Sequence, residues 1–120
     1  MPGNEITQRR NRKVVCITGC DSGFGQGLAR KFLKENANEY VVIACCLTSP
    51  AVSAWRQEAQ GEGASSMVPI RLDVTNSDSI AAAMPLIKSA CANERDDSSL
   101  WALVNNAGVV HFAPFEWQDD

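Results

Sequence analysis

The sequence has little of what several classes of protein require. Histidine occurs once in 120 residues, and no cluster of side chains at zinc spacing accompanies it. The formal net charge is −3, so there is no basic field of the kind that nucleic-acid-binding proteins carry. No apolar run approaches the length of a membrane span or a signal-peptide core. We therefore expect a cytoplasmic protein that binds neither nucleic acid nor a metal ion.

The five cysteines are an odd number and show no metal-binding spacing. Cys16 and Cys20 flank a glycine-rich turn, and Cys45 and Cys46 are adjacent in an apolar run. Adjacent cysteines do not readily bridge one another, and Cys91 stands alone. The cysteines are therefore interpreted as small core residues.

The length leaves room for one small domain. Residues 1–12 form a polar lead-in, and residues 13–120 alternate buried strands with amphipathic helices. Strands are predicted at 14–17, 40–46, 67–72 and 100–104. This βαβαβαβ order predicts an α/β fold, the first half of a Rossmann-type doubly wound parallel sheet. Pro69 cannot donate to a strand ladder, so the third strand should lie at an edge, which gives the order 3-2-1-4.

The first two helices have predicted faces and ends. In the first, from about residue 24 to 36, Phe24, Leu28 and Phe32 recur at a spacing of four and should share the buried face. The second should be capped by Ser49 and begin at Pro50, because proline is tolerated in a first turn.

The third helix should be capped by Thr75 or Ser77. Pro85 falls in its interior, where a kink is expected. One face carries the apolar residues Ile80, Met84, Ile87 and Cys91.

The last predicted strand, Leu100–Val104, is apolar on both faces and requires a neighbour on its far side. After the Asn105–Gly108 segment that ends this strand, only residues 109–120 remain, which is too short for another strand and helix. We therefore expect a truncated chain, the N-terminal part of a larger enzyme.

The glycine-rich turn after the first strand is the most informative stretch. Orphan amides and the positive end of the helix dipole make such a turn an anion site. Thr18, Gly19, Gly23 and Gly25 match the pattern Thr-Gly-x-x-x-Gly-x-Gly. Two alternatives fit the turn alone: the first motif of S-adenosylmethionine-dependent methyltransferases, read from Asp21, and a plain strand-to-helix turn.

Two further motifs follow the third and fourth strands, at the edge of the sheet where ligands bind. They are Leu72-Asp73-Val74-Thr75 and Asn105-Asn106-Ala107-Gly108. With the glycine turn, they make residues 13–118 resemble the short-chain dehydrogenase/reductase family. Within this family, the residues of these motifs are most similar to the branch that holds retinol dehydrogenases, 17β-hydroxysteroid dehydrogenases and 3-hydroxybutyrate dehydrogenase.

The resemblance implies an NAD(P)-dependent oxidoreductase that interconverts an alcohol and a ketone on a small hydrophobic substrate, such as a steroid or retinoid. It implies that the first-turn residues line the pyrophosphate and adenosine, that Asp73 and Val74 contact the adenine, and that residues 106–108 flank the ribose. We expect the complete protein to be a homo-oligomer. The implied cofactor-binding residues are Gly19, Asp21, Ser22, Gly23, Phe24, Gly25, Asp73, Val74, Asn106, Ala107 and Gly108.

The choice between NAD and NADP depends on charge near the adenosine ribose. Cys45, Cys46 and Leu47, at the end of the second strand, offer neither an acid nor a base. Asp21 would oppose a 2′-phosphate by about 3 kcal/mol per unit charge at ~5 Å and an effective dielectric constant of ~20. No lysine or arginine in the turn offsets it. NAD is therefore the expected cofactor, and NADP is the alternative.

The family's catalytic Tyr-x-x-x-Lys pair has no counterpart here. The only tyrosine is Tyr40, and Ala44 stands four residues later. The family's serine is also unmatched and would lie beyond Asp120, so no catalytic residue is assigned. His111 is interpreted as an exposed loop residue, with a substrate contact as the alternative. A non-catalytic nucleotide-binding remnant remains the rival hypothesis; the methyltransferase is disfavoured because no acid closes the second strand.

Overall fold

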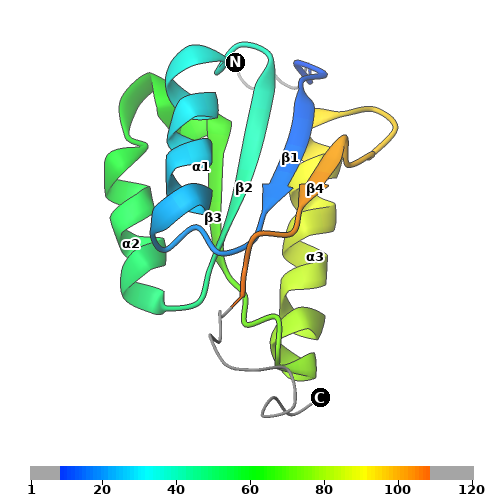
Figure 1. The fold of residues 1–120 in the computed structure, drawn as a ribbon. Helices are drawn as coiled ribbons and strands as arrows, with labels where there is room; N and C mark the ends of the chain where they lie inside the picture. Colours follow the sequence, from blue (N-terminus) through cyan, green and yellow to red (C-terminus); the bar gives the residue numbers. More distant parts are fainter. Residues whose placement is uncertain (1–8, 109–120) are drawn as a thin grey trace, which may run out of the picture.

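The computed structural model describes residues 9–108, which form a four-stranded parallel sheet flanked by helices (Figure 1). The strand order is β3-β2-β1-β4 and every neighbouring pair is parallel, so the predicted Rossmann-type half-sheet is confirmed. The elements are β1 (Lys13–Ile17), α1 (Gly23–Glu35), β2 (Tyr40–Cys46), α2 (Ser49–Glu58), the 3₁₀ helix η1 (Gly61–Ser66), β3 (Met67–Arg71), α3 (Ser77–Glu94) and β4 (Ala102–Val104).

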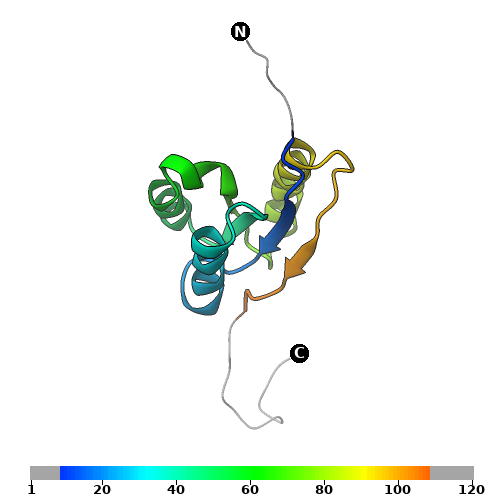
Figure 2. The same ribbon diagram turned by 90° about the horizontal axis from the view of Figure 1, so that it is seen from above.

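The sheet separates two apolar cores. Figure 2, which views the molecule from above and roughly along the strands, shows α1 and α2 on one side of the sheet and α3 on the other. Side chains alternate along β1, so that Val15 and Ile17 face the first core while Val14 and Cys16 face the second. Both faces of the two central strands are therefore buried, which explains why their sequences are continuous apolar runs.

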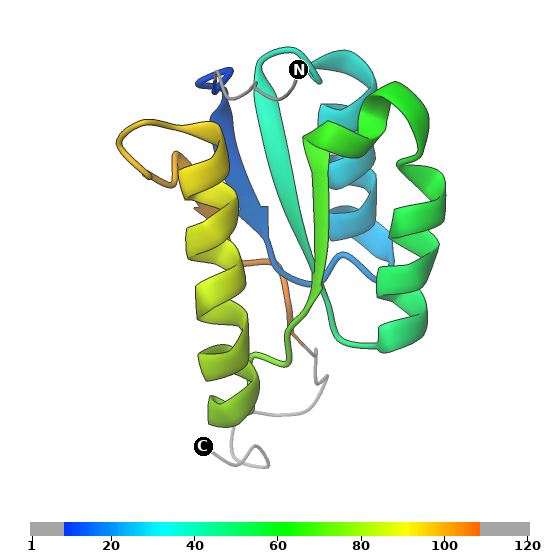
Figure 3. The same cartoon turned by 180° about the vertical axis from the view of Figure 1, so that it is seen from behind.

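Strand β3 lies at one edge of the sheet, as Pro69 predicted, between α2 and α3 (Figure 3). The amide of Leu72 donates to the carbonyl of Cys46 on β2 at 2.8 Å. Because backbone groups point alternately to the two sides of a strand, the position of Pro69 faces the open side. Its missing N–H therefore costs the ladder no hydrogen bond.

Two helix caps differ from the prediction. The N-cap of α2 is Thr48, whose hydroxyl accepts from the amide of Ala51 at 3.3 Å, and Ser49 is the first helical residue. The N-cap of α3 is Asn76 rather than Thr75 or Ser77, because its amide oxygen reaches two backbone amides of the first turn. Thr75 instead donates to Asp73 from both its amide and its hydroxyl.

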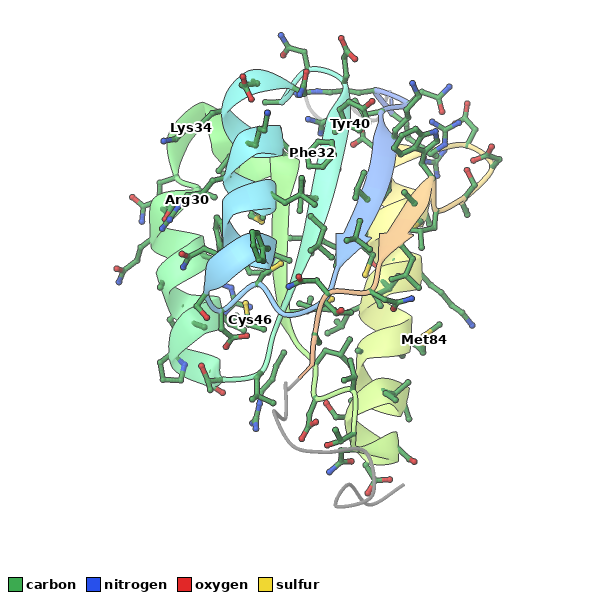
Figure 4. All side chains as sticks on the ribbon, in the orientation of Figure 1. Arg30, Phe32, Lys34, Tyr40, Cys46 and Met84 are labelled. Atoms are coloured by element: carbon green, nitrogen blue, oxygen red, sulfur yellow. The ribbon has the colours of Figure 1, made fainter. Side chains whose placement is uncertain are left out.

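The predicted helix faces are wrong in part. Leu28 and Phe32 pack on the first core, but the side chain of Phe24 is 92% exposed because it stands in the first turn, at the end of the sheet. On α3, Ile80 and Met84 are each 41% exposed. Figure 4 shows where Met84 lies on this helix. Alanines meet the sheet in their place, which lets the helix lie close to it; the buried residues of α3 are Ala83, Ala90, Cys91 and Glu94. The helix continues through Pro85 to Glu94.

Strand β4 is shorter than predicted, since only Ala102–Val104 pairs with β1. Leu103 within β4 and Trp101 just before it stay accessible, each with 54% of its surface exposed. Within residues 9–108, no strand pairs with the outer edge of β4. No helix in this described part is long and apolar enough to cross a membrane. Nor do its residues gather a group of three or more potential metal ligands.

All five cysteines are buried free thiols, and the sulfur atoms of Cys16 and Cys45 lie 3.5 Å apart. Burial raises the pKa of Cys20 and of Cys46 to about 12 each. We expect the folded protein to show no fast reaction with an aromatic disulfide reagent at about pH 8, because burial denies the reagent access to all five thiols and the raised pKa keeps Cys20 and Cys46 protonated. All five thiols should react in denaturant, as measured by the released chromophore. A rapidly labelled thiol in the folded protein would contradict this expectation.

Candidate functional site

The carboxyl ends of the four parallel strands meet at one edge of the sheet, the lower edge in Figure 1. Ligands of open α/β sheets bind at this edge. The predicted site residues lie on three loops there: the turn after β1, the loop after β3 and the loop after β4. The first and third of these loops are in direct contact, whereas that of Asp73 and Val74 stands beyond β2.

Thr18 joins the turn after β1 to the loop after β4. Its hydroxyl oxygen accepts from the amides of Asn106 and Ala107, each at 3.0 Å. The side-chain amide of Asn106 in turn donates to the carbonyl of Gly19 at 3.2 Å. Sequence reasoning used Thr18 as part of a motif but did not assign it this role. Its position, directly between a buried strand and a glycine, is the signal that could have found it.

The glycines of the turn serve different purposes. Gly19 and Gly23 have φ values of +72° and +63°, in the left-handed region that favours glycine. A Cβ on Gly23 would enter open space, so only its backbone conformation requires glycine. A Cβ on Gly25 would overlap the carbonyl oxygen of Gly19 and lie 2.5 Å from the side-chain nitrogen of Asn106. Gly25 therefore allows α1 to pack against the turn and the loop after β4.

The N-terminus of α1 is left without a side-chain acceptor in the described structure. Its N-cap, Ser22, makes no capping hydrogen bond, and the first turn holds no acidic residue. By contrast, Thr48 caps α2 and Asn76 caps α3. The first amides of a helix carry partial positive charge and need acceptors. This end of α1, beside the glycine turn, is thus suited to an anion such as a phosphate group.

Asp21 reaches from the first turn to the end of β2. Its carboxylate accepts from the amide of Leu47 at 2.8 Å, and from the amide and hydroxyl of Thr48 at 3.2 and 3.3 Å. Arg71 of β3 holds the same segment from the other side, since its Nε donates to the carbonyl of Leu47 at 3.1 Å. The sequence showed no ionisable group at the end of β2, but the fold brings an acid and a base there.

Asp73 stabilises the loop after β3 through hydrogen bonds to Thr75. One of its carboxylate oxygens accepts from the amide and the hydroxyl of Thr75, at 2.9 and 2.6 Å. These hydrogen bonds, first of all the one from the hydroxyl, hold the pKa of Asp73 below its usual value. Val74 and Leu47 leave 44% and 53% of their surface exposed on the neighbouring loops. This part of the edge thus combines a carboxylate with accessible apolar side chains.

Comparison with known proteins identifies the family. A model of the short chain dehydrogenase family matches residues 13–120. This chain belongs to the short-chain dehydrogenase family. The matched residues include all four strands of the described sheet and the three loops that carry the predicted site residues.

Several curated relatives are similar over nearly the whole chain. The 17-beta-hydroxysteroid dehydrogenase type 6 of Rattus norvegicus is 40% identical over 114 residues, which are 94% of this chain and 32% of the relative. Retinol dehydrogenase 16 of Homo sapiens is 41% identical over 88% of this chain and 30% of its own length. This chain therefore spans about a third of the length of these relatives.

The solved structure of a menthone neomenthol reductase from Mentha piperita has a similar fold. It superposes with a TM-score of 0.63 at 25% identity, over 82% of this chain and 32% of that chain. The structural comparison thus finds a similar fold in a reductase.

The only tyrosine in the sequence, Tyr40, is far from the candidate site. Tyr40 begins β2, at the opposite edge of the sheet from the glycine turn (Figure 4). Its ring packs edge-on against Phe32 and Trp101, with centroid distances of 4.9 and 5.5 Å. Tyr40 therefore has a packing role. His111 lies outside the described residues.

Proposed function

We propose that this chain binds a nicotinamide dinucleotide at the carboxyl edge of its sheet, with the pyrophosphate over the N-terminus of α1. Short-chain dehydrogenases generally use NAD or NADP. The observation that carries the proposal is the uncapped end of α1 beside the glycine turn, whereas the other two α-helices of residues 9–108 are capped by their own side chains. A bound phosphate would supply the missing acceptor.

The other predicted contacts are arranged around that anchor. Gly19, Ser22 and Gly23 would present backbone groups to the pyrophosphate, and the exposed ring of Phe24 would stand beside it. Asp73 and Val74 would meet the adenine on the far side of β2. Residues 106–108 would flank a ribose, because Thr18 and Gly25 hold them against the turn.

We propose that the complete protein transfers a hydride between the nicotinamide and the carbinol carbon of a hydrophobic alcohol such as a steroid or retinoid. The names of the relatives, 17-beta-hydroxysteroid dehydrogenase and retinol dehydrogenase, support this substrate class. The residues described here would bind and orient the cofactor. We expect groups other than Tyr40 to exchange the alcohol proton, because Tyr40 is half-buried against Phe32 and Trp101 at the opposite end of the sheet from the glycine turn. NAD is the cofactor that we favour.

The test is to occupy the anion site with a side chain. In Ser22→Asp, the new carboxylate can accept from the first amides of α1 and would compete with the pyrophosphate. We expect the wild-type chain to bind NAD in calorimetric titration, and the variant to bind at least about tenfold more weakly without losing thermal stability.

Ser98→Asp is the matched control, since it adds the same charge on an exposed loop before β4, at the opposite edge of the sheet. It should bind NAD as the wild type does. The proposal fails if the wild-type chain binds no NAD, or if both variants bind it equally well.

A further inference from the structure

The end of β2 is held by a carboxylate that comes from elsewhere in the chain. In dinucleotide-binding sheets, an acid about 20 residues after the glycine turn commonly accepts a hydrogen bond from the adenosine ribose at this end. Here β2 ends at Cys45 and Cys46, which are buried thiols. Asp21 fills the position in space, because its carboxylate contacts the two residues that follow β2.

The hydrogen bonds of Asp21 leave room for a donor but not for an acceptor. A carboxylate offers about four acceptor positions, and Leu47 and Thr48 occupy three of them. One position remains on the oxygen that accepts from Leu47. A ribose hydroxyl can donate to it, whereas a phosphate at neutral pH has no strong donor to offer. The two amides that could have bound a phosphate are already taken by Asp21.

The charges around Asp21 also favour a ribose hydroxyl over a phosphate. None of the ion pairs among the described residues includes Asp21. The nearby Arg30 pairs with Glu58 through two hydrogen bonds, at 2.7 and 2.9 Å. Arg71 is the cation beside the loop, and it is bound to the carbonyl of Leu47 through Nε. Within the described residues, no cation therefore pairs with the carboxylate beside the segment where a 2′-phosphate would have to lie.

We propose that Asp21 is the residue by which this chain selects NAD over NADP. It acts as an internal anion on the loop after β2, accepts the 2′-hydroxyl of the adenosine ribose and repels a 2′-phosphate. Arg71 fixes the same loop and is the group that would bind the phosphate once Asp21 is neutralised. This inference rests on the proposed dinucleotide site.

The variant Asp21→Asn tests the proposal directly. It removes the charge and replaces one acceptor oxygen by an amide that can donate to a phosphate. We expect the wild-type chain to bind NAD at least about tenfold more tightly than NADP, and the variant to lose that preference through a gain in NADP affinity of about tenfold or more. Calorimetric titration with NAD, NADP and adenosine 2′,5′-bisphosphate measures both. In Asp21→Asn/Arg71→Gln, the gain for NADP and the bisphosphate should disappear.

Thr48→Val is the control for loss of loop structure, since it removes a hydroxyl that bonds Asp21 and caps α2 but keeps the carboxylate. Its melting temperature should fall while its preference for NAD remains. The inference is overturned if the wild-type chain binds NAD and NADP alike, or if Asp21→Asn keeps the preference for NAD. Binding of neither dinucleotide to the wild type would overturn the proposed function itself, and this inference with it.

Discussion

Replacing Arg12 by methionine is expected to lower the free energy of unfolding by about 3–5 kcal/mol. The guanidinium of Arg12 is buried, with only 4% of the side chain exposed, and it pairs with Glu94 at 2.6 Å. Removing one partner of a buried ion pair leaves the other charge without compensation, which costs more than the pair itself contributes. Urea unfolding of the two proteins, followed by tryptophan fluorescence, measures the difference.

The expected loss is large because Arg12, just before β1, connects its own segment to three other parts of the fold. Besides Glu94 at the end of α3, its side chain donates to the carbonyl of Ala37 before β2 at 2.9 Å. It also donates to the hydroxyl of Ser66 and the carbonyl of Ser65 in η1, at 2.9 and 3.0 Å. Methionine would fill much of the volume but would satisfy none of these acceptors.

Arg9→Met is the matched control. Arg9 also pairs with an acid, Asp96, but the two side chains are 48% and 80% exposed. Exposed pairs contribute about 0–1 kcal/mol, so this variant should unfold close to the wild type. Equal destabilisation by Arg9→Met and Arg12→Met would contradict the assignment of the effect to burial.

The same pair gives the stability a dependence on pH. Burial alone would raise the pKa of Glu94, but hydrogen bonds from the side chain and backbone of Arg12, with its charge, hold it below the usual value of 4.5. Because the folded-state pKa is the lower one, this contribution is present above about pH 4.5 and is lost as the pH falls through the folded-state pKa. Glu94→Gln should therefore flatten the decline of stability in acid.

The sequence allowed the sheet to be predicted because its signals are local. The β-branched runs of β1 and β2 and the proline of β3 each report the burial or edge position of one segment. The location of the candidate site also follows from the sequence, since parallel strands bring their carboxyl ends to one edge of the sheet. The predicted cofactor contacts themselves remain predictions.

The contacts that define the site depend on residues distant in the chain. Asp21 meets Leu47 across 26 positions, and Thr18 meets Asn106 across 88. No periodicity reports such pairs, because each partner alone is an ordinary loop residue. The helix faces were wrong for a related reason. The spacing of Ile80 and Met84 indicates an apolar stripe, but in the structure alanines of α3 are buried while Ile80 and Met84 are each 41% exposed.

Gly25→Ala is expected to abolish measurable NAD binding and to cost about 3 kcal/mol in stability. The new methyl group would overlap the carbonyl oxygen of Gly19 and press on Asn106, both of which belong to the loops of the candidate site. To relieve the overlap, the start of α1 must move away from the loop after β4. Titration with NAD and urea unfolding measure the two effects.

Two neighbouring glycines provide a graded comparison. Gly23→Ala meets no atom but must adopt a φ of +63°, which costs about 1–2 kcal/mol. Gly27→Ala lies inside α1 with open space around it, and should stabilise the protein by about 0.5–1 kcal/mol through helix propensity. If Gly25→Ala behaved like Gly27→Ala, α1 would not pack against the turn as described. The amides proposed to bind the pyrophosphate would then lack the support that fixes their direction.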